Sequence, residues 1–284
     1  MLRPWQPPSL SPPAMAFPHK NTPPRLKFPR ASASTTNASE EDDNRSQPGK
    51  IRRQVLTQQG RGKLDLRSDR DFYAYPRFVT HVDGGFISAL TELYRRRLQS
   101  GSEVLDLMSS WVSHLPEEME FKRVVGHGLN AQELARNPRL DYFFVKDLNR
   151  DQRLELESSS FDAVLCTVSV QYLQYPEQVF AEVFRALRPG GVFIVSFSNR
   201  MFYEKAITSW RDGSDYSRVQ LVVQYFQSVV GFTGAEVVRK SPGGRKGGEG
   251  ERPWYMGLLE LLSGSSKDPF YAVIAYKNFK PVYE

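Results

Sequence analysis

Short apolar runs that alternate with amphipathic stretches constrain the fold of this chain most strongly. They are rich in Val, Ile, Leu and Phe with little polar alternation, as expected of strands buried on both faces of a parallel sheet. The runs are EVLDLM (103–108), RVVGHG (123–128), DYFFVKD (141–147), FDAVLCTVSV (161–170) and GGVFIVSFS (190–198). Between the last two, PEQVFAEVFRALRPGG begins at Pro176 and ends in a Pro-Gly-Gly stop, which predicts a helix. The pattern therefore predicts a βαβ unit within an α/β fold.

Further helical and strand patterns flank these runs. We expect a helix within 78–99, a second at 216–230, and strands at 235–240 and 268–277. The segment 241–267 is rich in glycine and charge in its first half, which predicts a flexible insertion. The sequence thus predicts one folded domain over 71–280.

The first 39 residues have no such pattern. They hold nine of the 19 prolines, eight Ser or Thr and five basic residues, but no Asp or Glu. A secretory signal would need a continuous apolar core, whereas this composition is typical of an organelle transit peptide. The prolines favour import into the chloroplast (plastid stroma), with the mitochondrion as the alternative and an untargeted disordered tail as the plainer interpretation. We expect residues 1–50 to form a disordered transit peptide and linker.

Charge and cysteine content exclude several classes of partner and site. The net charge is +6, and the five basic residues of the tail account for most of it, so no basic surface for nucleic acid is expected. No apolar run reaches the roughly 18–20 residues of a membrane-spanning helix. Cys166 is the single cysteine, which excludes an internal disulfide and a cysteine-cluster metal site. We expect no metal site and interpret Cys166 as a core residue.

The turn after the first apolar run is the place to look for a ligand. In an open α/β sheet, ligands bind beyond the carboxyl ends of the strands, where the strand order reverses. The turn reads DLMSSWV from Asp106 to Val112. Because Asp106 follows a buried strand, we favour a role at the ligand over a purely structural role in the turn.

Three short motifs occur in order at workable spacing: VLDL, FDAVLC and LRPGG. With these motifs, the chain resembles class I S-adenosylmethionine-dependent methyltransferases of the small-molecule, type 11 group. The resemblance covers roughly Phe78 to Lys277. It implies a doubly wound, mostly parallel seven-stranded sheet of the Rossmann-like methyltransferase type, ending in an antiparallel hairpin. It also implies S-adenosyl-L-methionine as the methyl donor and a small-molecule acceptor.

One motif departs from the family. Its usual D-L-G-x-G-x-G would place glycines at Met108, Ser110 and Val112, where glycine allows a positive φ and close approach to the ligand. Ser109 and Ser110 could cap a following helix, cut short by Pro116, and present a hydroxyl to the donor's carboxylate. Bacterial and plant members of the group with DLMSSW in place of the glycines are similar here, so the departure is typical of a subfamily.

The resemblance assigns further residues to the donor. Gly128 stands where the family places the acid that binds the ribose, and Asn130 is the expected polar substitute. Asp147 would accept from the adenine amino group, with a solvated turn residue as the equally open alternative. Thr167 and its neighbour would lie beneath the methyl donor. The predicted donor-binding residues are Asp106, Leu107, Met108, Ser109, Ser110, Gly128, Leu129, Asn130, Asp147, Leu148, Asn149, Thr167 and Val168.

The sequence assigns no catalytic residue. Methyl transfer depends largely on aligning the acceptor with an activated donor, so a dedicated base is optional. His81, His127, Tyr172 and Glu204 are candidate bases, but each is more often structural or exposed.

Two aromatic segments are candidates for acceptor recognition: DFYAYPRFVTH (71–81) and SNRMFYEK (198–205), with PWYMGLLELL (253–262) as a third. Arg77, Arg200 and Lys205 in the first two would suit a flat or anionic molecule, although a lid packed for stability is the plainer interpretation. Two other functions stay open. One is a catalytically inactive binding or regulatory protein, because the three glycines are missing. The other is a nicotinamide oxidoreductase, which would need Gly-x-Gly-x-x-Gly and a later acid that this chain lacks.

Overall fold

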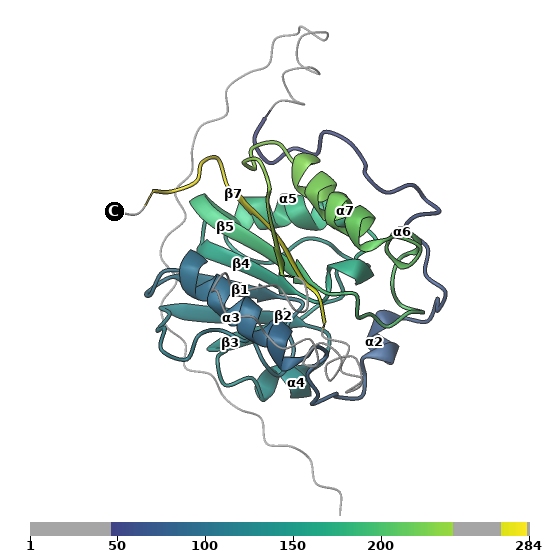
Figure 1. Cartoon of the computed structure of the whole chain (residues 1–284), viewed down its shortest axis with the longest axis horizontal. Coiled ribbons are helices and arrows are strands. Elements are labelled where there is room, and N and C mark those ends of the chain that lie inside the picture. Colours follow the sequence, from purple (N-terminus) through teal and green to yellow (C-terminus); the bar gives the residue numbers. More distant parts are fainter. Residues whose placement is uncertain (1–46, 241–267, 283–284) are drawn as a thin grey trace, which may run out of the picture. The chain divides into compact units, whose positions relative to one another are not determined.

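The computed structural model describes residues 47–240 and 268–282, and Figure 1 shows how their helices and strands are arranged. The strands are β1 (Glu103–Leu107), β2 (Arg123–Gly128), β3 (Tyr142–Val145), β4 (Phe161–Thr167), β5 (Leu187–Phe197), β6 (Glu236–Lys240) and β7 (Phe270–Tyr276). The helices are α2 (Asp69–Phe72), α3 (Gly84–Arg97), α4 (Ala131–Ala135), η1 (Val170–Tyr172), α5 (Pro176–Ala186), α6 (Thr208–Arg211) and α7 (Asp215–Gln227). Each expected strand and long helix is present. The predicted insertion and nearly all of the predicted transit segment lie outside the described residues.

The seven strands form one sheet in the order β3-β2-β1-β4-β5-β7-β6. Strands β1 to β5 pair in parallel, whereas β7 pairs antiparallel with both β5 and β6. The chain leaves β1 toward one side of the sheet and β4 toward the other, so the strand order reverses between these two neighbours. This confirms the doubly wound, mostly parallel α/β sheet with an antiparallel end.

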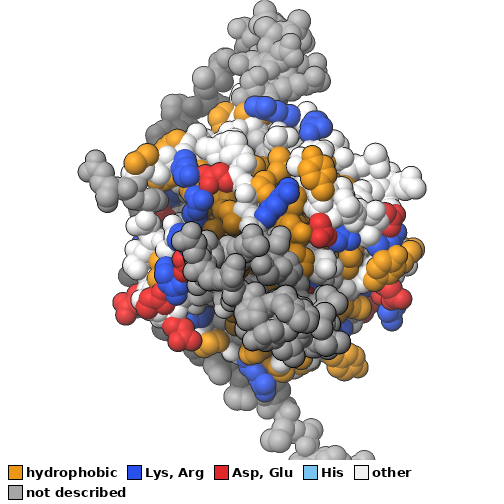
Figure 2. Space-filling view, viewed as in Figure 1, with side chains coloured by type: hydrophobic (Ala, Val, Ile, Leu, Met, Phe, Trp, Pro, Cys, Tyr) orange, Lys and Arg blue, Asp and Glu red, His pale blue; other side chains and the backbone are white. Residues whose placement is uncertain are grey.

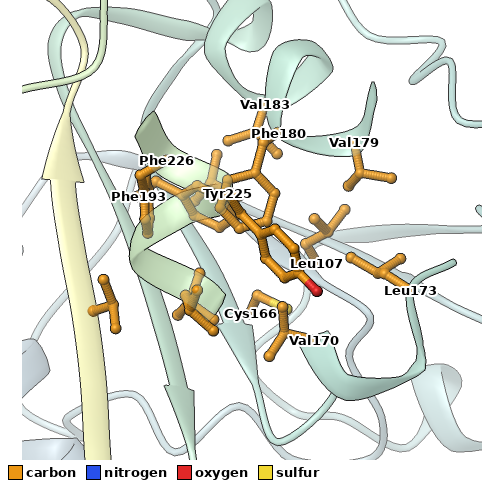
Figure 3. Close-up of a cluster of buried hydrophobic side chains, with 14 of the residues drawn as sticks. Leu107, Cys166, Val170, Leu173, Val179, Phe180, Val183, Phe193, Tyr225 and Phe226 are labelled. Carbon is orange, nitrogen blue, oxygen red and sulfur yellow. The ribbon is translucent and has the colours of Figure 1, made fainter. Parts of the chain in front are cut away.

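Helices cover both faces of the sheet (Figure 1). α3 packs on one face, where Phe86 and Leu90 join Ile194 of β5 in a buried cluster. α5 and α7 pack on the other, where Phe226 joins Phe193 of β5, with ring centroids 5.2 Å apart (Figure 3). Neighbouring residues of β5 thus point to opposite faces, as the two-residue period of a strand requires. Burial on both faces explains why the strands are continuously apolar.

The stretch from β1 to β2 contains no helix, which makes the prediction of a capped helix after the first turn wrong. His114 has a φ of 53°, outside the helical range. Pro116 lacks an N–H and disfavours helical geometry at the residue before it. Trp111 and Val112 are weak helix formers as well. The first turn therefore offers no helix N-terminus to a bound carboxylate.

Folded structure begins before the boundary at residue 71 that the sequence suggested. Ile51 forms an antiparallel bridge with Val229, and the N–H of Gly49 donates to the carbonyl of Val230 at 2.7 Å. Leu56 is buried in the core beside α5. The polar character of this segment hid its packing, because its contacts are mainly hydrogen bonds to residues far along the chain.

On the face drawn in Figure 2, basic and acidic side chains are interspersed with hydrophobic ones. Among the described helices, none is both long and apolar enough to cross a membrane. Within 47–240 and 268–282, no three His, Cys, Asp or Glu side chains gather in a way that could hold a metal ion. Cys166 is 1% exposed in the core, where burial raises the pKa of its thiol to about 12.

Candidate functional site

A cavity of about 410 Å³ opens at the carboxyl ends of β1, β2, β3 and β4. It spans the point between β1 and β4 where the strand order reverses, the usual ligand position in such sheets. Its volume falls within the roughly 300–1,000 Å³ typical of small-molecule sites. The predicted residues that line it are Met108, Ser109, Ser110, Gly128, Leu129, Asn130, Asp147, Leu148, Asn149, Thr167 and Val168.

Two residues of the cavity wall have strained backbones. Met108, after β1, has a φ of 57°, and Val168, after β4, has a φ of 51°. A positive φ is unfavourable for any residue with a Cβ and especially for a β-branched one. Met108 stands at the family's first glycine position and adopts the left-handed conformation that glycine would permit. Strain of this kind concentrates at binding sites, where the surrounding structure enforces it.

His127 holds the first turn in place. Its Nδ1 accepts from the backbone N–H of Met108 at 3.1 Å, and its carbonyl oxygen accepts from the N–H of Ser109 at 2.6 Å. Nε2 donates to the carbonyl of Lys146 at 2.9 Å, so both ring nitrogens are engaged. Burial lowers the pKa of His127 to about 4, and the imidazole is neutral at physiological pH. His127 is therefore a structural bridge between β1, β2 and β3 rather than a base.

The two serine hydroxyls of the turn are used within the protein. Ser109 donates to a carboxylate oxygen of Asp106, and Ser110 donates to a carboxylate oxygen of Glu133, each at 2.6 Å. A hydroxyl has one proton to donate. The predicted hydrogen bonds from these hydroxyls to a ligand carboxylate are therefore not available in this arrangement.

Asp106 and Leu107 do not line the main cavity. Leu107 packs in the core. Asp106 is 4% exposed, and burial raises the pKa of its carboxyl to about 6 against the opposing hydrogen bonds from Ser109 and Ser113. It borders a smaller adjoining cavity of about 70 Å³ together with Trp111. The Trp111 ring lies outside the main cavity wall, with its N–H directed to a backbone carbonyl.

Gly128 is required by the turn that faces it. A Cβ at this position would lie 2.6 Å from the carbonyl oxygen of Ser109, and backbone atoms cannot move aside as a flexible side chain would. The acid that the family carries here is thus incompatible with this turn.

We expect Gly128→Ala to lower the free energy of unfolding by about 1–3 kcal/mol, measured by urea unfolding. Gly84→Ala is the control because nothing lies within 4 Å of its added Cβ; equal unfolding midpoints for the two variants would contradict the prediction.

Asn130 is fully engaged as the cap of α4. Its Oδ1 accepts from the N–H groups of Gln132 and Glu133, and its Nδ2 donates to the carbonyls of Tyr73 and Ala74. The side-chain amide has no further proton or lone pair to offer. Asn130 lies at the cavity as predicted, but its amide cannot serve as the ribose partner that the sequence suggested.

Asp147 keeps an acceptor for a ligand, unlike Asn149. Oδ1 of Asp147 accepts from the N–H of Asn149 at 2.9 Å, while Oδ2 has no hydrogen-bond donor among the described residues. Asn149 donates to Asp69 at 2.8 Å and to the carbonyl of Tyr172 at 2.9 Å. Asp147 therefore combines a turn role with a free oxygen at the cavity.

The two aromatic segments predicted for acceptor recognition meet at Phe202. Its ring centroid lies 5.3 Å from that of Phe72, 5.4 Å from His81 and 6.1 Å from Tyr172. The guanidinium of Arg77 lies 5.3 Å from the Phe202 centroid. The residues of these two segments that line the cavity are Tyr73, Arg77, Thr80, His81, Arg200, Met201 and Phe202. The third segment, 253–262, lies outside the described residues.

Lys205 is not at the cavity. Its side chain is 1% exposed and forms ion pairs with Asp65 at 3.4 Å and Asp69 at 3.3 Å. Lys63 also pairs with Asp69, at 2.6 Å. These buried charges fasten the segment before α2 to the segment after β5, and Asp69 reaches the cavity from this cluster.

The remaining candidate bases differ in position. Tyr172 lines the cavity, but its hydroxyl accepts from the N–H of Phe202 at 2.8 Å and burial raises its pKa. His81 lines the cavity, and desolvation lowers its pKa. Glu204 is exposed and does not line the cavity. The geometry gives no reason to assign a catalytic base.

Sequence reasoning missed Glu133. It is 8% exposed, lines the cavity, and accepts from the N–H of Arg77 at 2.6 Å as well as from Ser110. The sequence does contain a pattern that predicts the position of Glu133, because Asn130-Ala-Gln-Glu133 has the spacing of a helix capping box. That pattern places Glu133 in the first turn of a helix beyond the carboxyl end of β2.

Residues 113–195 match a protein family whose description is "Methyltransferase domain". The match begins directly after the turn that lacks the glycines and runs to β5. Among curated proteins, the biotin biosynthesis bifunctional protein of Teredinibacter turnerae is 29% identical over 89 residues. This stretch covers 31% of the present chain and 16% of that protein, so only a small part of the relative's length is matched.

Solved structures share the fold. Phosphoethanolamine N-methyltransferase 2 of Haemonchus contortus, in complex with S-adenosyl-L-methionine, has a TM-score of 0.50 at 18% identity, over 75% of this chain and 61% of that one. An S-adenosylmethionine-dependent methyltransferase of Mesorhizobium loti has a TM-score of 0.43 at 18% identity, over 66% and 96% of the two chains. Residues 113–195 thus match a methyltransferase domain, and the described chain shares the fold of a solved methyltransferase.

Proposed function

We propose that this protein transfers a methyl group from S-adenosylmethionine to a small, flat or anionic acceptor. The observation that carries the proposal is the position of the cavity, which opens between the carboxyl ends of β1 and β4 and is bordered there by the strained residues Met108 and Val168. Unfavourable backbone conformations cluster at binding and catalytic sites. Two of them at one cavity therefore support a ligand-binding role for it.

The free polar groups of the cavity fit the donor. Oδ2 of Asp147 can accept from the adenine amino group, as an acceptor without a donor of its own among the described residues. Within 47–240 and 268–282, Nη1 of Arg77 is buried without a hydrogen-bond partner, and it can donate to an anionic group. Thr167 and Val168 would lie beneath the bound donor, which supplies an activated methyl group.

The aromatic side of the cavity suits the acceptor. Tyr73, His81, Tyr172 and Phe202 form a wall of rings that can stack on a flat molecule. Alignment in such a site can supply much of the rate, since holding two reactants in a near-attack geometry removes the entropic cost of bringing them together. The residues here orient and desolvate, and no proton transfer by the protein is required.

Titration calorimetry with the full chain tests the proposal. We expect S-adenosylmethionine and S-adenosylhomocysteine to bind and NADPH not to bind. A folded protein that binds none of the three would instead support the inactive binding or regulatory alternative, which the internally bonded turn favours. Binding of NADPH alone would overturn the assignment in favour of an oxidoreductase.

We further propose that the protein acts in the plastid. The support is the composition of residues 1–39, which are rich in proline, Ser, Thr and basic residues and free of acids. The mitochondrion is the alternative destination for such a segment.

A further inference from the structure

The first turn leaves a ligand carboxylate without its expected partners. No helix begins after β1, so there is no helix N-terminus at this point. The N–H groups of Met108 and Ser109 donate to His127. The hydroxyls of Ser109 and Ser110 donate to buried carboxylates, as described above. The backbone N–H of Ser110 has no acceptor among the described residues and remains available at the cavity. A ligand carboxylate at this end therefore still lacks a charged donor.

Arg77 has such a donor. Its Nη2 donates to the carbonyl of Phe72 at 3.0 Å, but its Nη1 is buried and has no hydrogen-bond partner among the described residues. The guanidinium is held by the rings of Phe72, Tyr73 and Phe202, at 4.6, 5.5 and 5.3 Å from their centroids. Aromatic contacts orient a guanidinium without using its N–H groups. An unsatisfied buried N–H of a charged group is costly, which indicates a ligand that satisfies it.

The lysine and the other arginine of the cavity wall each have an acidic partner. Lys146 pairs with Asp151 at 2.7 Å, and Arg200 pairs with Asp268 at 2.6 Å. Asp69 pairs with two lysines. Among the described residues, Arg77 has no acidic partner for its guanidinium. Its positive charge is therefore available to an anion in the cavity.

The backbone of Arg77 is tied to the turn. Its N–H donates to Oε1 of Glu133 at 2.6 Å, while Oε2 of the same carboxylate accepts from the hydroxyl of Ser110 at 2.6 Å. Glu133 thus joins Arg77 to the part of the turn where the amino-acid end of the donor is expected. Because this link holds the backbone of Arg77 at the same end of the cavity, we take the donor rather than the acceptor as the source of the anion.

We infer that Arg77 binds the carboxylate at the amino-acid end of S-adenosylmethionine, in place of the glycine-rich turn and helix N-terminus that this chain lacks. The inference rests on the proposed function. It deepens that function by naming the residue that distinguishes the donor from an analogue without the carboxylate.

A comparison of two donors in two proteins tests the inference. Calorimetry gives the Kd of S-adenosylmethionine and of decarboxylated S-adenosylmethionine for the wild-type chain and for Arg77→Gln. We expect the wild type to bind the carboxylate-bearing donor about 10- to 100-fold more tightly, the effect of one charge-assisted hydrogen-bonded pair. Arg77→Gln should bind the two donors about equally. Retained binding of the decarboxylated donor also shows that the variant is folded.

Arg136→Gln is the matched control, since the guanidinium of Arg136 also lies over an aromatic ring, 4.1 Å from the Phe78 centroid, but Arg136 does not line the cavity. It should keep the wild-type preference for the carboxylate. If Arg77→Gln also keeps that preference, or the wild type has none, the assignment of Arg77 is wrong while the proposed function stands. If the wild type binds neither donor, the proposed function fails and the role of Arg77 fails with it.

Discussion

Replacing Glu177 with alanine is expected to lower the free energy of unfolding by about 3–5 kcal/mol, the effect of removing one partner of a buried ion pair. The side chain of Glu177 is 0% exposed and that of Arg61 is 9% exposed, with Arg61 Nη2 lying 3.1 Å from Glu177 Oε1. Oε1 also accepts from the N–H groups of Val55 and Leu56, at 2.6 and 3.1 Å. The substitution would leave a buried guanidinium and two backbone donors without their acceptor.

This anchor also reaches the candidate site. Arg61 donates to the carbonyl of Gln174, and the N–H of Gln174 donates to Oδ1 of Asn149 at 2.8 Å. Asn149 lines the cavity and donates in turn to Asp69. Loss of Glu177 should therefore loosen one wall of the cavity in addition to destabilising the fold.

Urea unfolding of the full chain, followed by circular dichroism, measures the effect. Glu92→Ala is the matched control, because Glu92 is also helical but its side chain is 36% exposed and pairs with Arg95 and Arg96 on the surface. Exposed pairs contribute about 0–1 kcal/mol. A loss for Glu177→Ala no larger than that for Glu92→Ala would refute the prediction.

The Arg61–Glu177 pair illustrates what the sequence could not predict. The strands were predictable because burial on both faces leaves continuous apolar runs, and α5 was predictable because Pro176 and the Pro-Gly-Gly stop mark its ends. The two charged residues carry no such periodic signal. Their contact joins residues separated by 116 positions, and burial of the pair depends on the tertiary fold.

The candidate site was predictable in location but not in its hydrogen bonds. Strand order fixes where the cavity opens, and the predicted residues Met108, Asp147 and Thr167 line it. The partners of each polar group were not predictable. His127 and Glu133 take the donors of the first turn, and the missing helix removes its N-terminal amides. These details depend on how β2 and α4 pack against the turn.

A second large effect is expected at Asp106 and depends on pH. Burial raises the pKa of this carboxyl from 3.8 to about 6. The folded state therefore binds the proton more tightly than the unfolded state does. The stabilisation from this proton is fully present below pH 3.8 and is lost as the pH rises through 6. At pH 7 and above, the buried charge lowers the free energy of unfolding by about 3 kcal/mol relative to the uncharged form.

Asp106→Asn removes this charge at every pH, and its carbonyl oxygen can still accept from the Ser109 hydroxyl. We expect the variant to be more stable than the wild type by about 3 kcal/mol at pH 8 and nearly equal to it at pH 4. His127, whose pKa burial lowers from 6.5 to about 4, favours the fold less as the pH falls through that range. It is present in both proteins, so its contribution cancels in their difference.

Urea unfolding of both proteins at pH 4, 6 and 8 gives the difference directly. Asp151→Asn is a control of opposite sign, because Lys146 lowers the pKa of Asp151 and the substitution should reduce stability at neutral pH. A difference between Asp106→Asn and the wild type that stays flat from pH 4 to pH 8 would contradict the expected coupling.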